Sequence, residues 1–242
     1  MGYMLSSASM RKPKIIAHRG YSSKFRENTW EAFEGAYQVR ADMIELDLVL
    51  TKDRKIFVNH DLNINGKLIR DMNLEEAKKM IPGSMEVSEV LKWTEDRGIG
   101  LYLDIKDRDM IEELTHILKD FGYKTDIVVS SSDDFPFMRR FKELNDHILT
   151  ALLFRNVLPP EDMVSLARKY QGDIIHPCWE DKHPFPHTLI SSEDIEHMKG
   201  EGFEVVCWHE ERESELRELV KKGFWGITTN DPEKLRDIVD KL

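Results

Sequence analysis

The segment from Met43 to Asp61 reads MIELDLVLTKDRKIFVNHD and contains two strand-like runs, Met43–Leu50 and Lys55–His60. Only residues 51–54 separate the two runs, which leaves no room for the crossover helix that a parallel pair requires. The runs are therefore predicted to form an antiparallel hairpin. If the turn centres on residues 53 and 54, positions whose numbers sum to about 107 face each other, which sets Asp47 opposite His60.

Further strand-like runs occur along the rest of the chain, and several are apolar throughout, as in parallel strands buried on both faces. They are Lys14–His18, Gly100–Ile105, Asp126–Ser130, Ile148–Phe154, Asp173–His176, Glu204–Trp208 and Gly226–Thr229. Amphipathic helical stretches lie between most of them. Setting aside the returning arm of the hairpin leaves eight parallel strands. The sequence therefore predicts an α/β fold, a (β/α)8 TIM barrel with a β-hairpin extension after the second strand.

Three helical stripes have recognisable ends. Asn28 and Glu31 are predicted to form a capping box at the start of the first. Gly122 and Gly223 are expected to end the other two, because glycine readily adopts the left-handed conformation that ends helices. The stripes comprise Trp30, Phe33 and Tyr37; Met110, Ile111, Leu114, Ile117 and Leu118; and Leu216, Leu219 and Val220. We expect these residues to face the core rather than a cofactor.

The composition limits the class of protein. The chain has 242 residues, of which 40% are hydrophobic and 33% charged, which is typical of a globular protein with one sizeable core. The net charge of -10 argues against nucleic acid as the main partner, because a phosphate backbone requires a basic face. Cys178 and Cys207 lack metal-type spacing, so they are interpreted as reduced, buried thiols.

No domain boundary or targeting segment is evident. Residues 1–12 are predicted to be a loose N-terminal segment, and residues 13–242 a single barrel domain. The chain has no apolar run of the roughly 18 residues that a membrane span needs. It also lacks the basic start of a signal peptide. A cytoplasmic protein without an integral membrane segment is therefore expected, and a weak homodimer is compatible with the sequence.

Charged and aromatic side chains gather at predicted strand ends. In barrels of this kind the chemistry takes place at the C-terminal ends of the strands. The hairpin is expected to return His60 to the same mouth. The residues at or near those ends are His18, Glu45, Asp47, Asp104, Lys106 and Trp208. No glycine-rich dinucleotide loop follows the first strand, which disfavours a doubly wound sheet.

Glu45 and Asp47 lie two positions apart, so their side chains share one face of the strand. Buried carboxylates are costly without a counterion. A divalent metal ion is the simplest remedy, and oxygen ligands favour Mg²⁺, Ca²⁺ or Mn²⁺. The alternative is a pair of salt bridges to Arg19 and Lys106. Because histidine titrates near neutral pH, His18 and His60 are candidates for general acid and base.

The sequence resembles the glycerophosphodiester phosphodiesterases, a family of (β/α) barrels. The matching segments are IIAHRG at 15–20, RENTWEAF at 26–33, IELDLVLTKD at 44–53, VNHD at 58–61, LDIK at 103–106, VCWHE at 206–210 and GITTNDPEKL at 226–235. They occur in the family's order and together are highly specific. The resemblance implies metal-dependent hydrolysis of glycerophosphodiesters, small-molecule substrates, to an alcohol and sn-glycerol 3-phosphate.

The resemblance also implies roles for individual residues. His18 and His60 are the general base and acid in an order left open. Asp104 is the third metal ligand, at a position where the family usually has a glutamate.

The remaining predicted contacts are with the substrate. Arg19 and Lys106 supply positive charge for the phosphate. Glu27 orients Arg19 or approaches the metal, while Asn28 caps the helix. Trp208 forms a wall for the alcohol or is simply a buried barrel residue.

Alternatives to this function remain at this stage. One alternative is a related phosphodiesterase acting on lysophospholipids. Metal-dependent amide or ester hydrolases on this barrel commonly have a His-x-His pair at the first strand, where this chain has His18, Arg19 and Gly20. A noncatalytic barrel that binds metal poorly is favoured only by Asp104.

The segment at 179–190, WEDKHPFPHTLI, is predicted to be a surface loop that shapes the mouth and selects the alcohol. His176, His183 and His187 are candidates for a zinc site. Their spacing does not suit a helix-based site, because Pro184 and Pro186 interrupt any helix. An ordinary loop is therefore the preferred interpretation.

Overall fold

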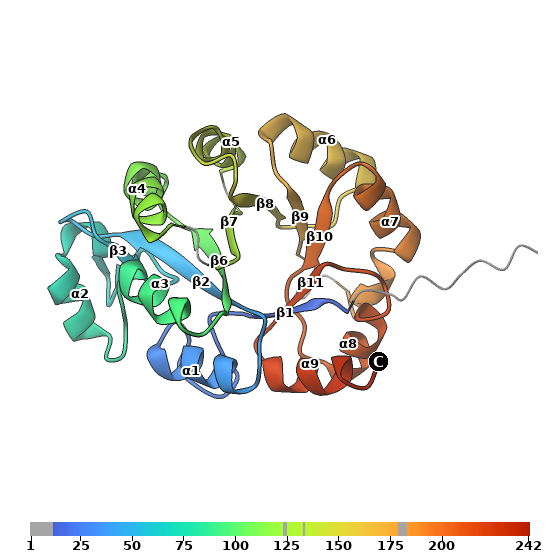
Figure 1. Cartoon of the computed structure of the whole chain (residues 1–242), viewed down its shortest axis with the longest axis horizontal. Coiled ribbons are helices and arrows are strands. Elements are labelled where there is room, and N and C mark those ends of the chain that lie inside the picture. Colours follow the sequence, from blue (N-terminus) through green and yellow to red (C-terminus); the bar gives the residue numbers. More distant parts are fainter. Residues whose placement is uncertain (1–11, 123–124, 133, 179–182) are drawn as a thin grey trace, which may run out of the picture.

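Eight parallel strands close into a barrel in the computed structural model, which describes residues 12–122, 125–132, 134–178 and 183–242. Around the ring the strands run β1, β2, β6, β7, β8, β9, β10 and β11, and β11 pairs again with β1 (Figure 1). Their bounds are Lys14–Ala17, Met43–Leu50, Gly100–Ile105, Ile127–Ser131, Leu149–Phe154, Ile174–Pro177, Glu204–Cys207 and Gly226–Thr229. The predicted (β/α)8 barrel is confirmed.

The hairpin after β2 is confirmed, but its predicted register is wrong by one residue. β3 (Ile56–Val58) lies antiparallel to β2 outside the ring, and Leu48 faces Val58. Asp47 therefore lies opposite Asn59, whose backbone N–H donates to the Asp47 carbonyl at 3.0 Å. The reason is the turn: Thr51 N–H donates to the Lys55 carbonyl, which leaves a loop of three residues. Arg54 has a φ of 57°, as is typical at the end of such a loop.

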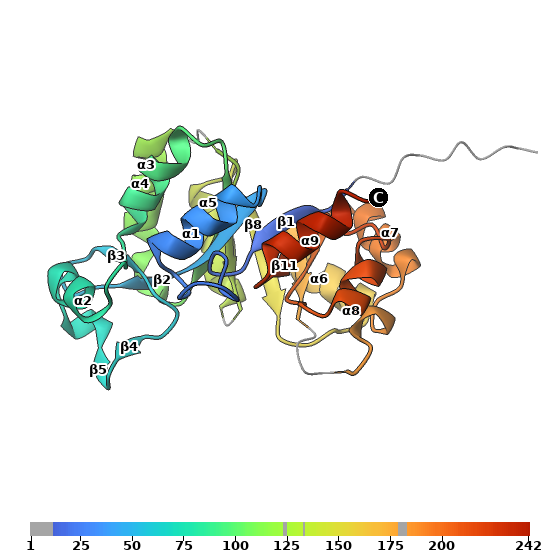
Figure 2. The same cartoon turned by 90° about the horizontal axis from the view of Figure 1, so that it is seen from below.

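The chain between β3 and β6 forms an excursion that the sequence analysis did not resolve. It contains β4 (Asn63–Ile64), β5 (Lys67–Leu68), α2 (Leu74–Met80) and α3 (Val87–Glu95). Figure 2 shows β4 and β5 projecting beside α2. Asn65 and Gly66 both have positive φ, 52° and 81°, as a two-residue hairpin turn requires. An apolar cluster packs the excursion against β2 and β3, and it includes Val49, Phe57, Ile69 and Met72.

The other helices surround the barrel (Figure 1). They are α1 (Trp30–Gln38), α4 (Ile111–Phe121), α5 (Phe135–Leu144), α6 (Pro160–Tyr170), α7 (Ser192–Gly200), α8 (Glu213–Leu219) and α9 (Pro232–Val239). Gly122 ends α4 with a φ of 72°, as predicted. α8 ends before Gly223, at Leu219.

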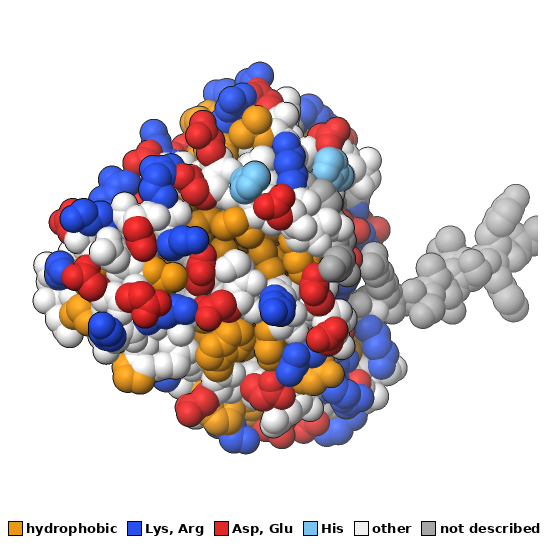
Figure 3. Space-filling model, turned by 60° about the vertical axis from the view of Figure 1, so that its left-hand side comes forward, with side chains coloured by type: hydrophobic (Ala, Val, Ile, Leu, Met, Phe, Trp, Pro, Cys, Tyr) orange, Lys and Arg blue, Asp and Glu red, His pale blue; other side chains and the backbone are white. Residues whose placement is uncertain are grey.

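The surface of the molecule is mixed in charge. Acidic and basic side chains are interspersed on the face shown in Figure 3, around hydrophobic side chains near its centre.

The predicted capping box at α1 is wrong. The N-cap is Thr29, whose hydroxyl accepts the Ala32 N–H. Asn28 has a φ of 55°, and its side-chain amide donates to Asp47 at 2.8 Å instead. The side chain expected to cap the start of α1 thus bonds to Asp47 of β2, because the backbone at Asn28 has turned away from the helix.

Inward-pointing side chains form two layers in the barrel. The lower layer is mainly apolar and consists of Ile16, Met43, Tyr102, Val128, Ala151, Ile174 and Val206. Two residues further along the strands, where side chains point inward again, lies an upper layer. It consists of His18, Glu45, Asp104, Ser130, Leu153, His176, Trp208 and Thr228. The change from apolar to polar locates the site at the C-terminal ends of the strands.

Several sequence predictions concern features away from this layer. Cys178 and Cys207 are buried free thiols, as expected. Within the described residues no helix is both long and apolar enough to cross a membrane. Of the predicted N-terminal segment 1–12, only Lys12 is described. The boundary between it and the barrel domain stays a prediction.

Candidate active site

Three buried carboxylates converge at the mouth of the barrel. Glu45 and Asp47 come from β2 and Asp104 from β6, where Asp47 and Asp104 are paired in register. One oxygen of each lies within 4.8 Å of the others. The shorter side chain of Asp104 still reaches the cluster, and the Ser130 hydroxyl donates to it at 3.0 Å. The three predicted metal ligands are therefore brought together.

Two cations lie against this cluster. Lys106 Nζ is 3.0 Å from Asp47 Oδ1 and 2.5 Å from Asp104 Oδ2. Arg19 Nε is 3.2 Å from Asp47 Oδ2, and its Nη1 is 2.9 Å from Glu27. Four carboxylates thus face two cations, and the deficit of two positive charges equals the charge of one divalent metal ion. The salt bridges expected as an alternative are present at Asp47, but they do not neutralise the site.

The pKa directions reflect this imbalance. Burial, together with the charges of Asp47 and Asp104, raises the pKa of Glu45 well above its usual range. Burial and the Asp47 charge also raise the pKa of Asp104. Burial acts in the same direction on Asp47, but Lys106, Arg19 and the Asn28 hydrogen bond outweigh it and lower the pKa. Hard carboxylate oxygens of this kind fit Mg²⁺, Ca²⁺ or Mn²⁺.

The turn formed by His18, Arg19 and Gly20 positions Arg19 beside the acidic cluster. Arg19 has a φ of 56° and Gly20 a φ of 83°. A Cβ atom at Gly20 would lie 2.7 Å from the carbonyl carbon of Ala32, so α1 packs against the turn only because this residue is glycine. The Arg19 backbone N–H donates to Glu45 at 2.9 Å. Glu27 holds the guanidinium, which supports the predicted orienting role.

His18 is held from several sides in the upper layer. Its Nδ1 is 2.7 Å from Asn230 Oδ1, and the Trp208 indole N–H donates to its Nε2 at 3.1 Å. These partners assign the proton to Nδ1 and the lone pair to Nε2. The His209 ring stacks on His18 with 4.8 Å between centroids. Burial, aided by the charges of Arg19 and His209, lowers the pKa of His18 well below its usual value.

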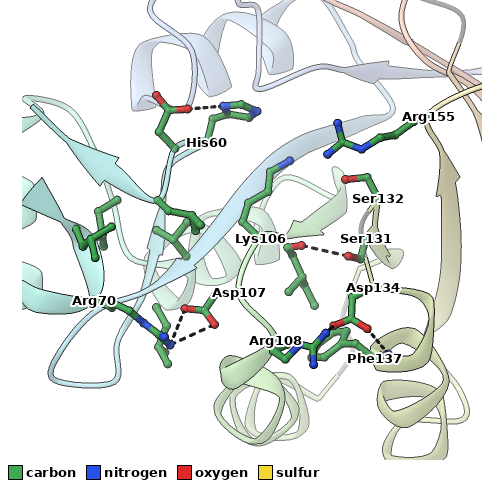
Figure 4. A pocket seen from close by; sticks show the side chains of 17 residues that line it. His60, Arg70, Lys106, Asp107, Arg108, Ser131, Ser132, Asp134, Phe137 and Arg155 are labelled. Atoms are coloured by element: carbon green, nitrogen blue, oxygen red, sulfur yellow. Dashed lines mark hydrogen bonds and ion pairs between the residues drawn. The ribbon is translucent and has the colours of Figure 1, made fainter. Parts of the chain in front are cut away.

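His60 lies at the edge of the site rather than in its centre. Its side chain is 39% exposed, and Nδ1 is 2.8 Å from Asp61 Oδ1. His60 and Lys106 line an outer pocket of about 550 Å³ (Figure 4). Lys106 also lines the small central cavity, together with His18 and the acidic cluster. The two histidines therefore approach the site from different cavities that share one lysine.

Sequence reasoning missed several side chains of the site. Asn28 was assigned to a helix cap, and Asn230 and His209 lie within quoted motifs without an assigned role. Tyr102 and His176 form a buried pair in which the hydroxyl is 2.8 Å from Nδ1. Burial lowers the pKa of His176 to about 3 and, with the Asp104 and Glu45 charges, raises that of Tyr102.

The zinc alternative is not supported by these contacts. His176 is paired with Tyr102, His187 Nδ1 with Glu215 at 2.7 Å, and His183 accepts the Phe185 N–H. In the part of the chain that the structure describes, the acidic cluster is the single group with metal-ligand geometry. Residues 179–182 of the loop lie outside the described residues, so its role in choosing the alcohol stays a prediction.

The fold and the site define a (β/α)8-barrel hydrolase with an acidic, metal-type centre. The chain belongs to the glycerophosphoryl diester phosphodiesterase family, whose sequence model matches residues 18–234. It is therefore an enzyme of the phosphoric diester hydrolase class, and the resemblance seen in the sequence is confirmed. The two other functions considered from the sequence, an amide or ester hydrolase and a noncatalytic barrel, are therefore set aside.

Individual relatives agree with this assignment. The chain is 30% identical to a glycerophosphodiester phosphodiesterase of Caldanaerobacter subterraneus subsp. tengcongensis, covering 95% of this chain and 99% of that protein. It is 23% identical to a lysophospholipase D of Homo sapiens, covering 93% and 86%. A phosphodiesterase of Oleispira antarctica, solved with the product sn-glycerol-3-phosphate, has a TM-score of 0.81 at 19% identity, covering 95% and 97%. At that identity the last comparison supports the fold.

Proposed function

We propose that this enzyme hydrolyses glycerophosphodiesters to an alcohol and sn-glycerol 3-phosphate with the help of one divalent cation, Mg²⁺, Ca²⁺ or Mn²⁺. The observation that carries the proposal is the buried cluster of Glu45, Asp47 and Asp104, which together with Glu27 has two more carboxylates than cations. The named activity of the bacterial relative supports the substrate class.

The charged groups of the central cavity have parts in this chemistry. Glu45, Asp47 and Asp104 would hold the cation, which neutralises charge on the phosphoryl oxygens when bound. Arg19 presents a planar, charged donor fork. Lys106 lines both cavities, which supports a role for its ammonium in binding the phosphate between them. Trp208 acts on His18 as well as lining the central cavity.

The two histidines suit opposite proton transfers. His18 is neutral near pH 7, because its pKa is lowered by burial. Asn230 fixes the tautomer that leaves a lone pair on Nε2, so His18 is suited to be the general base. Asp61 accepts from His60 Nδ1 and orients the ring, and His60 lies on the outer side of Lys106, opposite the cavity that contains His18. His60 is therefore suited to protonate the leaving alcohol.

The test measures sn-glycerol 3-phosphate release from glycerophosphocholine with EDTA, Mg²⁺, Ca²⁺ or Mn²⁺. Turnover is expected to require metal and to fall about 10²–10⁴-fold in His18→Ala and in His60→Ala. His116→Ala, at an exposed position on α4, serves as the control. Full turnover in EDTA, or in both active-site variants, would contradict the proposal.

A further inference from the structure

The aromatic stripe predicted on the first helix enters the core only in part. Phe33 is fully buried, whereas Trp30 is partly exposed and Tyr37 is 38% exposed. Trp30 contacts Trp93 of α3, which lies next to α1 (Figure 1), with 6.0 Å between the ring centroids and 51° between the ring planes. The two tilted indoles form the side of a groove between these helices.

The groove is aromatic rather than aliphatic. Its volume of about 530 Å³ lies within the range of sites that bind small organic ligands. Phe25, Trp30 and Trp93 line it, and among the described residues no aliphatic side chain joins them. The groove lies outside the barrel and shares no lining residue with the cavities that contain His18 and His60.

Gly35, in the middle of α1, allows the third ring to reach the groove. A Cβ atom at this position would lie 2.5 Å from Cε2 of Phe25, so the Phe25 ring packs directly against the backbone of the helix. Glycine is unfavourable inside a helix. At this position it lets a ring from the preceding turn complete the aromatic lining.

The charge of the groove is negative. Glu31 and Glu34 line it, and among the described residues no cation does. In the part of the chain that the structure describes, the Glu31 side chain has no hydrogen bond or ion pair. Glu34 has one ion pair, in which Oε2 lies 3.8 Å from Nη2 of Arg97. Ring faces together with carboxylates are the surroundings that an organic cation prefers.

Two of the three rings already attract cations of the chain itself. Cζ of Arg97 lies 4.5 Å from the Trp93 centroid, and Nζ of Lys24 lies 5.9 Å from the Phe25 centroid. Neither cation lines the groove, so neither fills it. Within the described residues no cation lies over Trp30. The rings therefore suit a cation, and the groove has room for one from outside the chain.

We propose that the groove between α1 and α3 is a binding site for a quaternary ammonium cation of the choline type. Its methyl groups would contact the ring faces of Trp30 and Trp93, while Glu31 and Glu34 balance its charge. A quaternary ammonium has no N–H group, so it leaves no hydrogen bond unmade among aromatic rings. The site goes beyond the proposed function, because it lies outside the barrel and holds its ligand without cleaving it.

The experiment titrates the enzyme with choline in the presence of Mg²⁺ and follows the indole N–H resonances of ¹⁵N-labelled tryptophan. The matched ligand is the neutral carbon isostere of choline, in which a tert-butyl group replaces the trimethylammonium group. The Trp30 and Trp93 resonances, assigned from Trp30→Leu and Trp93→Leu, should shift together. Choline should bind about tenfold or more tightly than the isostere. The resonance of Trp225, which does not line the groove, should stay in place.

Glu31→Gln/Glu34→Gln tests the contribution of charge without removing a ring. The affinity for choline should fall by about threefold or more, and the affinity for the isostere should stay the same. Glu193→Gln/Glu196→Gln is the matched control, because it removes two exposed glutamates with the same spacing from α7. It should leave both affinities unchanged.

Four results would overturn the inference. They are the absence of any shift at Trp30 and Trp93, equal affinities for choline and the isostere, and an unchanged affinity for choline in Glu31→Gln/Glu34→Gln. The fourth is a shift confined to Trp208, which would place choline in the barrel mouth instead. None of these results bears on hydrolysis, so the proposed function would stand in each case.

Discussion

The upper and lower layers of the barrel interior lie two residues apart on the same strands, yet their side chains differ sharply. On β2 the inward side chain changes from Met43 to Glu45, and on β7 from Val128 to Ser130. Apart from Trp208, which is partly exposed, both layers are almost fully buried. Burying Met43 removes apolar surface from water and stabilises the fold, whereas burying Glu45 opposes its ionisation. The comparison indicates that one layer holds the barrel together and the other serves a ligand.

The largest expected effect separates activity from stability in the upper layer. Glu45→Gln should lower metal-dependent turnover by about 10³-fold or more, because the cation loses one of its three carboxylates. The raised pKa of Glu45 means that its ionised form destabilises the metal-free fold near neutral pH. The melting temperature in EDTA should therefore rise. A lower melting temperature of Glu45→Gln than of the unchanged enzyme in EDTA would contradict the view that Glu45 serves a ligand rather than the fold.

The lower layer should behave in the opposite way. Met43 is fully buried, so Met43→Ala should reduce the free energy of unfolding by about 2–5 kcal/mol. Turnover per folded molecule should stay unchanged at a temperature where the variant is folded. Urea unfolding gives the first quantity, and Met80→Ala, at an exposed position on α2, is the control. Loss of turnover in the folded variant would show that the layers are not separable.

Two neighbouring residues before α1, Asn28 and Thr29, separate activity from stability in the same way. Asn28→Gly removes a hydrogen bond to the charged Asp47 without straining the positive φ. Such bonds contribute about 1.5–3 kcal/mol, so kcat/KM should fall about 10- to 100-fold. Thr29→Ala removes the actual cap, and should reduce stability by about 0.5–2 kcal/mol with turnover retained. Equal effects of both changes on kcat/KM would contradict the assignment of Asn28 to the site.

The last prediction concerns the pair that joins the layers, Tyr102 below and His176 above. Because the folded pKa of His176 is about 3, the unfolded chain binds a proton below its ordinary pKa that the folded protein does not. Stability from this group is complete above about pH 6.5 and is lost as pH falls toward 3. Between about pH 7 and pH 5 the loss should be about 2 kcal/mol.

His176→Gln removes the titrating ring while keeping a side chain that can bond to Tyr102. Urea unfolding at the two pH values should show a smaller loss of stability in this variant than in the unchanged enzyme. An identical pH dependence in both would assign the acid sensitivity to other groups.

Much of the fold was predictable because apolar runs and their spacing are local properties. The hairpin followed from four residues that cannot hold a helix, and removing β3 from the count gave the eight-stranded ring. The predicted register was wrong by one residue because Arg54 adopts a left-handed backbone conformation. Arginine has no preference for this conformation, so the sequence did not indicate it. The β4–β5 hairpin was overlooked although Asn65 and Gly66 are a strong turn signal.

For the site, the sequence by itself determined which residue types are available and on which strand ends they lie. His18, Arg19, Glu45, Asp47, Asp104 and Lys106 were all found in this way, and the structure brings them together. Only the tertiary structure decided that Asn28 serves Asp47, that Trp208 and Asn230 hold His18, and that a second pocket opens beside His60. These contacts join residues from separate strands and loops, so they depend on barrel closure and side-chain direction, which no local pattern encodes.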